Sequence, residues 1–197
     1  MLARGLKSQQ GLTLIEILVA ISLFSLILLV VIDIFSMSQR SERRILTEQK
    51  VLAEGQLIMA KITQQVRTRL IEYSPSWPTG IINHELHLTD DLNSQIYFRQ
   101  GDSADLGSGC PAGVVHCVEV SFDGGASWES LTSDSLEVSK LIFYVYPLED
   151  PFEMSEEGYA SNIQPRVTIY LELNSTLPDA PDSLFLQTTA SSRVYKR

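Results

Sequence analysis

The sequence predicts an α+β fold in which one long N-terminal helix packs against a C-terminal antiparallel β-sheet. Three observations lead to this prediction. Residues 12–32 form an apolar run without glycine or proline. Residues 33–70 continue with apolar side chains at helical spacing and contain one glycine and no proline. Beyond a segment rich in proline at 73–80, short runs of alternating apolar and polar residues predict strands.

The apolar run at 12–32 is long enough for one helical crossing of a bilayer, which takes about 20 residues. Its only charged residue is Glu16. A carboxylate in a membrane span is costly, so Glu16 is a candidate functional residue. The preceding segment carries two positive charges, Arg4 and Lys7, and no negative charge. This charge pattern predicts a cytoplasmic N-terminus and an extracytoplasmic C-terminal domain.

The start of the apolar run carries a recognisable motif. The stretch Gly-Leu-Thr-Leu-Ile-Glu at 11–16, followed by an apolar helix, resembles the cleavage and methylation signature of type IV prepilins and type II secretion pseudopilins. The resemblance implies that a prepilin peptidase cuts after Gly11 and methylates the new N-terminus at Leu12. It also implies that Glu16 pairs with the N-terminus of the preceding subunit during assembly. An ordinary secretory signal is the alternative, but it has a shorter apolar region and no acidic residue within it.

Further similarities favour a minor subunit. Residues 57–67 look like the helix of minor pilins and of the J-type minor pseudopilin, and residues 187–193 are similar to their last strand. Asp33 stands where many major pilins carry a proline that breaks the helix. The resemblance thus implies a structural, non-enzymatic minor subunit of a type IV pilus (fimbrium) or of a pseudopilus for protein secretion or DNA uptake. Its implied partners are prepilin peptidase, other pilin or pseudopilin subunits, the inner-membrane assembly platform and membrane lipid.

The expected organisation has four parts. Residues 1–11 form a leader peptide, 12–32 a transmembrane assembly helix, 33–72 its amphipathic continuation, and 73–197 a β-rich extracytoplasmic domain. The residues expected to form the buried stripe of the continuation are Ile45, Leu52, Met59, Ile62, Val66 and Leu70. Gly55 is either a weak point of this helix or a position of close packing.

Strands and loops are expected to alternate after the helix. The expected strands are residues 81–88, 95–98, 114–122, 138–146, 166–173 and 183–195. Residues 101–113 are expected to form a loop, and residues 147–165 a long acidic loop. In the strand at 114–122, alternation places Val118, Val120 and Phe122 on one face and Glu119 and Ser121 on the other.

The charge balance limits the classes of partner. The chain has 15 basic and 24 acidic residues, a net charge of −9. Removal of the leader, which carries two basic and no acidic residues, leaves 13 basic and 24 acidic residues, a net charge of −11. Nucleic acid is not an expected partner, because phosphate binding requires clustered lysine and arginine.

The two cysteines, Cys110 and Cys117, are expected to form a disulfide, because the domain is predicted to be extracytoplasmic. Free thiols remain an alternative. So does a metal site formed by Cys110, His116 and Cys117, although such a site lacks a fourth ligand and a standard spacing.

Residues 121–128 fit the Asp-box pattern, which sialidase-type propellers and unrelated proteins share. Its residues here are Ser121, Asp123, Gly125, Ser127 and Trp128. The functional interpretation is a membrane-anchored module that binds glycans or is adhesive. The favoured interpretation is a self-supporting hairpin, because a single Asp-box cannot form a propeller of repeated blades.

No cofactor is expected, apart from a weak candidate for Ca²⁺ in the acidic loop. Its carboxylates are Asp150, Glu153, Glu156 and Glu157. They lack the spacing of an EF-hand, so a solvated loop is favoured. No serine–histidine–acid set, phosphate loop or metal signature is found, and the chain is not expected to be an enzyme.

Overall fold

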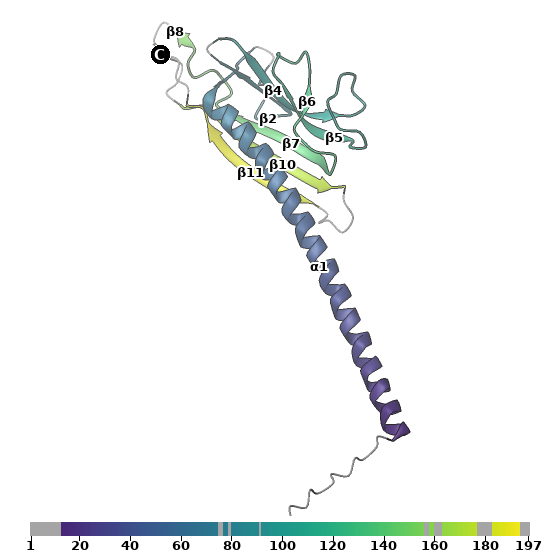
Figure 1. Cartoon of the computed structure of the whole chain (residues 1–197). Helices are drawn as coiled ribbons and strands as arrows, with labels where there is room; N and C mark the ends of the chain where they lie inside the picture. The colour runs from purple at the N-terminus through teal and green to yellow at the C-terminus, as the bar shows by residue number, and fades with distance from the viewer. Residues whose placement is uncertain are drawn as a thin grey trace, which may run out of the picture. The chain divides into compact units, whose positions relative to one another are not determined.

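The computed structural model describes residues 13–74, 77–78, 80–90, 92–155, 158–159, 163–176 and 183–193. The chain divides into two compact units, Met1–Arg43 and Arg44–Arg197. Helix α1 (Leu14–Thr68) begins in the first unit and ends in the second (Figure 1). It ends before the expected limit at residue 72, because Leu70 and Ile71 pair as a short strand with Leu88 and Thr89.

The strands of the C-terminal unit form two larger antiparallel sheets and a small hairpin, where the sequence predicted one sheet. The first sheet, in spatial order, contains β1 (Leu70–Ile71), β3 (Glu85–Thr89), β4 (Gln95–Asp102), β5 (His116–Ser121) and β6 (Glu129–Ser130). The second contains β11 (Leu184–Ser191), β10 (Arg166–Ser175), β7 (Leu136–Tyr146) and β2 (Ile82–Asn83). The hairpin, β8 (Met154–Ser155) and β9 (Gly158–Tyr159), lies within the expected acidic loop.

The core lies between the last part of α1 and the sheets. The helix buries Val51, Gly55, Ile58, Met59, Ile62 and Val66. The predicted stripe is therefore right from Met59 onward, but wrong for Ile45 and Leu52, which are 50% and 38% exposed. The true contact face follows the helical period of 3.6, whereas steps of seven residues drift by about 20° per heptad.

Gly55 is a position of close packing. A Cβ atom at Gly55 would lie 2.6 Å from Cδ1 of Leu186 and 2.9 Å from Cδ1 of Leu173. The absence of a side chain lets the helix approach β10 and β11 closely. The interpretation of Gly55 as a mere weak point is thus not supported.

Gly55→Leu is expected to lower the free energy of unfolding by about 1–3 kcal/mol, because the added side chain overpacks the contact with Leu173 and Leu186. Gly55→Ala is expected to be closer to neutral, because the flexible leucine ends can yield while the helix gains propensity. Urea denaturation monitored by tryptophan fluorescence would measure both changes. Ala53→Leu, at an exposed position of the same helix, is the matched control. Equal stability of Gly55→Leu and wild type would contradict the close packing.

Candidate functional site: the N-terminal helix and the disulfide region

The polar groups at the start of α1 are arranged as in a capping box. Thr13 directly precedes the helix, and the Glu16 side chain returns to it: the Thr13 backbone N–H donates to Oε2 of Glu16 at 3.5 Å. In a capping box, the glutamate at the third helical position accepts from the backbone N–H of the cap residue. The carboxylate also lies where the helix dipole favours negative charge.

This local role of Glu16 was missed in the sequence analysis, although the signal was present. The pattern Thr-Leu-Ile-Glu at 13–16 is the sequence signature of a capping box. Glu16 thus has two candidate roles, helix capping and charge pairing between subunits, and the two require separate tests.

The apolar half of α1 suits a lipid environment. Its side chains from Leu14 to Ile32 are exposed within the N-terminal unit, and the helix is long and apolar enough to cross a membrane. After Glu16, the only polar side chains in this stretch are Ser22 and Ser25. Their hydroxyls donate to the carbonyl oxygens of Leu18 and Ile21 at 2.9 and 2.8 Å. Both serines are therefore satisfied within the helix, as a membrane segment requires.

The comparison with protein families identifies this segment. Residues 6–32 match the prokaryotic N-terminal methylation motif. No curated protein and no solved structure matches the chain. The methylation motif supports the prepilin-type family and points to a structural subunit that is processed by prepilin peptidase and assembles with other pilin subunits. Gly11 and Leu12 lie outside the described residues, so cleavage and methylation there stay predictions.

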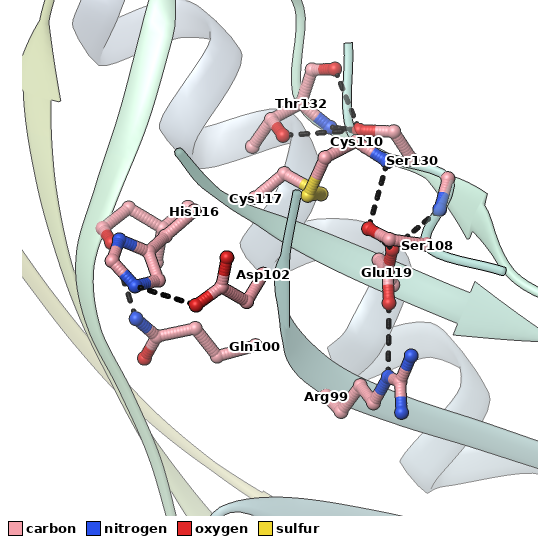
Figure 2. The surroundings of a disulfide bond; sticks show 12 residues. Arg99, Gln100, Asp102, Ser108, Cys110, His116, Cys117, Glu119, Ser130 and Thr132 are labelled. Carbon is pink, nitrogen blue, oxygen red and sulfur yellow. Dashed lines mark hydrogen bonds and ion pairs between the residues drawn. A yellow bond between two sulfur atoms is a disulfide. The ribbon is translucent and has the colours of Figure 1, made fainter. Parts of the chain in front are cut away.

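Outside the methylation motif, the structure joins Cys110 and Cys117 by a disulfide (Figure 2). The bond closes a loop with a sequence separation of 7 and links the segment before β5 to the strand itself. With both sulfurs bonded to each other, neither is a thiolate ligand for a metal. His116 lies beside Asp102 instead, with Nε2 3.6 Å from Oδ2.

Glu119 is the buried charge of this region, on the face of β5 opposite Val118 and Val120. Its side chain is 0% exposed and accepts from three groups. Nε of Arg99 donates at 2.9 Å, and Oγ of Ser108 and the backbone N–H of Gly109 each donate at 2.6 Å (Figure 2). Phe122 is misplaced by simple alternation, since it is 57% exposed. Ser108 and Gly109 of the loop before β5 contact Glu119 on its face of the strand, and β5 is buried on both faces.

The Asp-box residues form a closed set of hydrogen bonds. Asp123 accepts from the Ser127 hydroxyl at 2.6 Å, the Ser121 hydroxyl at 2.7 Å and the Ser127 backbone N–H at 2.9 Å. The Ser121 hydroxyl also accepts from the backbone N–H of Gly125. Gly124 and Gly125 have φ values of 70° and 93°, which residues other than glycine rarely adopt. These bonds make the turn self-supporting.

Trp128 of the Asp-box contributes to internal packing. The guanidinium carbon of Arg99 lies 3.9 Å from the centroid of the Trp128 ring, within range of a cation–π contact. The same Arg99 binds Glu119, so Trp128 is connected through Arg99 to the disulfide loop. This arrangement supports the hairpin interpretation over a glycan-binding one.

Hydrogen bonds from Ser127 and Ser121 lower the pKa of Asp123 from 3.8 to about 2. A carboxyl group whose pKa is lower in the folded than in the unfolded protein stabilises the fold fully at a pH above its unfolded-state pKa. For Asp123, this stabilisation is lost as the pH falls from about 4 to 2. Asp123→Asn is therefore expected to lose less stability than wild type over this pH range. Thermal melts at several pH values would measure the difference, with Asp134→Asn, an exposed site, as the control. Parallel pH profiles of wild type and Asp123→Asn would contradict the prediction.

The start of the acidic loop forms a tight turn before the β8–β9 hairpin. Oδ1 of Asp150 accepts from the backbone N–H of Phe152 at 2.9 Å. Burial and, secondarily, the charge of Asp150 raise the pKa of the Tyr73 hydroxyl, which donates to the Pro147 carbonyl. Glu156 and Glu157, half of the Ca²⁺ candidate, lie outside the described residues. Among the described residues, the one cluster with metal-ligand spacing is Cys110, Cys117 and Glu119, where the cysteines form the disulfide.

Proposed function

We propose that the chain is a minor structural subunit of a type IV pilus or of a type II secretion pseudopilus. Prepilin peptidase cleaves it after Gly11 and methylates Leu12. The apolar half of α1 then anchors the mature chain in the inner membrane, with the C-terminal domain outside, until the assembly platform moves it into the filament. The observation that carries this proposal is the methylation motif at 6–32, which leads directly into an apolar helix.

Two further observations support assembly through α1. The exposed apolar side chains of residues 14–37 need a covering, which lipid provides before assembly and other helices provide afterwards. Within residues 14–32, where it is the one acidic residue, Glu16 can attract the ammonium group of a neighbouring subunit's N-terminus. A glycan-binding function is not proposed, because Trp128 packs against Arg99 within the fold.

The mass of the N-terminal peptide, measured after co-expression with a prepilin peptidase, tests this proposal. The expected product starts at Leu12 and carries one additional methyl group. Gly11→Val is the matched control and is expected to remain uncleaved, since the resemblance places the cut directly after this glycine. An uncut wild-type chain, or a cut beyond residue 32, would overturn the proposal and leave the segment as a plain anchor or secretory signal.

A further inference from the structure

The outer strand β11 presents an open edge. It pairs with β10 on one side, and no strand pairs with its other side within the described part of the chain. Native edge strands are commonly protected by charges, proline or a bulge. The sequence of β11, Leu-Phe-Leu-Gln-Thr-Thr-Ala-Ser, has no charge and no proline, and its register with β10 is regular from end to end.

The hydrogen-bond pattern shows which backbone groups face the open edge. The Ser192 backbone N–H donates to the Pro165 carbonyl at 3.1 Å, and bonded and non-bonded pairs alternate along an antiparallel ladder. Ladder bonds to β10 are thus made by Leu184, Leu186, Thr188 and Ala190. The residues that direct their N–H and C=O groups away from β10 are Phe185, Gln187, Thr189 and Ser191. The hydroxyls of Thr168 and Thr189 lie 2.8 Å apart, as expected for a non-bonded pair, whose side chains approach closely.

An apolar hollow lies at the beginning of β11. Its volume is about 490 Å³, and its lining residues are Ile45, Glu48, Gln49, Val51, Leu52, Ser183 and Leu184. The exposed Ile45 and Leu52 are the two residues that the predicted core stripe placed wrongly in the interior. Their exposure on an amphipathic helix is explained if a further segment covers them.

The hollow borders the β11 side of the helix. Glu54 accepts at 2.6 Å from the Ser133 hydroxyl, which precedes β7, two strands away from β11. Leu52 and Glu54 project in nearly opposite directions, because two residues correspond to about 200° of helical turn. The flank with Leu52 therefore faces the open edge, and Leu52 and Leu184 both line the hollow.

We propose that the open edge of β11 binds an extended segment of another protein as an added strand. The exposed N–H and C=O groups of four alternate residues provide the backbone ladder. Side chains of the added strand that lie opposite Leu184 and Leu186 are on the helix side of the sheet, where Leu184 lines the hollow, and are apolar. Those opposite Gln187 and Thr189 face solvent and are polar. A second copy of the chain is disfavoured as the occupant, because each copy carries a net charge of −9. This inference does not depend on prepilin processing.

Amide hydrogen exchange of the full chain in detergent micelles tests the proposal. The probe is a short synthetic peptide that alternates valine and threonine, and the control peptide has prolines in place of the valines. The valine–threonine peptide is expected to slow exchange at Phe185, Gln187, Thr189 and Ser191 by roughly tenfold or more. The control peptide is expected to have no effect. Unchanged exchange with the valine–threonine peptide would overturn the proposal.

Matched variants assign the effect to the edge and to the hollow. Gln187→Pro removes one outward N–H without touching the ladder to β10 and is expected to abolish the protection. Gln187→Ala keeps the N–H and is expected to retain it. Leu52→Glu is expected to weaken peptide binding by roughly tenfold, whereas Leu57→Glu, an exposed site away from the hollow, leaves it unchanged.

Equal binding of the peptide to wild type, Gln187→Pro and Leu52→Glu would overturn the proposed binding as an added strand. Protection that grows with protein concentration without peptide would identify a second copy as the occupant and overturn the proposed partner.

Discussion

Glu119→Ala is expected to lower the free energy of unfolding by about 3–5 kcal/mol, because it removes one partner of a buried ion pair. The Glu119 side chain is 0% exposed, and the change leaves the Arg99 guanidinium without its carboxylate. It also leaves the Ser108 hydroxyl and the Gly109 N–H without their acceptor. For a protein of this size, each kcal/mol corresponds to a fall of roughly 2–4 °C in melting temperature. Calorimetry or urea denaturation would measure the loss.

Two further variants separate charge from shape in this region. Glu119→Gln keeps the size and one acceptor oxygen but loses the charge, so its cost is expected to lie between those of wild type and Glu119→Ala. Glu129→Ala, an exposed glutamate on the neighbouring β6, is expected to be within about 0.5 kcal/mol of wild type. A Glu119→Ala protein as stable as Glu129→Ala would show that the buried network contributes nothing to the fold.

The same network explains why Gly101 is present on β4. A Cβ atom there would lie 2.2 Å from Cδ of Glu119 and 2.5 Å from its Oε2. Residue 101 pairs with Cys117 across the ladder, so the glycine leaves room for the carboxylate beside the disulfide strand. Sequence reasoning assigned Gly101 to a loop because glycine commonly marks loops. The requirement for space comes from a side chain that is distant in the sequence.

The fold class followed from local patterns that are strong in this chain. The apolar run and the helical spacing predict α1, and the strand expected at 166–173 is present as β10. Its alternating residues Val167, Ile169, Leu171 and Leu173 are buried. The division into two sheets was not predictable, because alternation assigns a face to each residue but not a partner to each strand. β5 shows the limit most clearly: Glu119 is buried against Ser108 and Gly109 of a loop whose course local periodicity does not encode.

The candidate site also has features that the sequence predicts and features that depend on how the strands pair. The stretch Gly-Leu-Thr-Leu-Ile-Glu is a continuous motif, so sequence alone predicts its processing. The contact of Trp128 with Arg99 joins residues from β4 and the end of the Asp-box turn, and only the paired strands bring them together. The open edge of β11 likewise depends on the strand order, which the sequence pattern does not specify.

Glu16→Ala is expected to leave cleavage and methylation intact while it reduces incorporation into filaments by an order of magnitude or more. The proposed reason is the loss of a charge pair with the N-terminal ammonium group of the preceding subunit, in surroundings of low dielectric constant where an unpaired charge is costly. Quantitative immunoblotting of sheared filaments, set against the membrane pool, would measure incorporation. The mass of the N-terminal peptide would report processing. Ser22→Ala, which removes a hydroxyl bonded within the same helix, is the matched control.

Glu16→Gln separates the two roles of this residue. Glutamine at the third helical position preserves a capping box, since its amide oxygen still accepts from the Thr13 backbone N–H, but it carries no charge. If the ion pair between subunits drives assembly, Glu16→Gln fails as completely as Glu16→Ala. If capping of α1 is the essential role, Glu16→Gln assembles normally and Glu16→Ala does not. Normal filament recovery for both variants would exclude both roles, and assembly would then rest on the apolar surface of α1 alone.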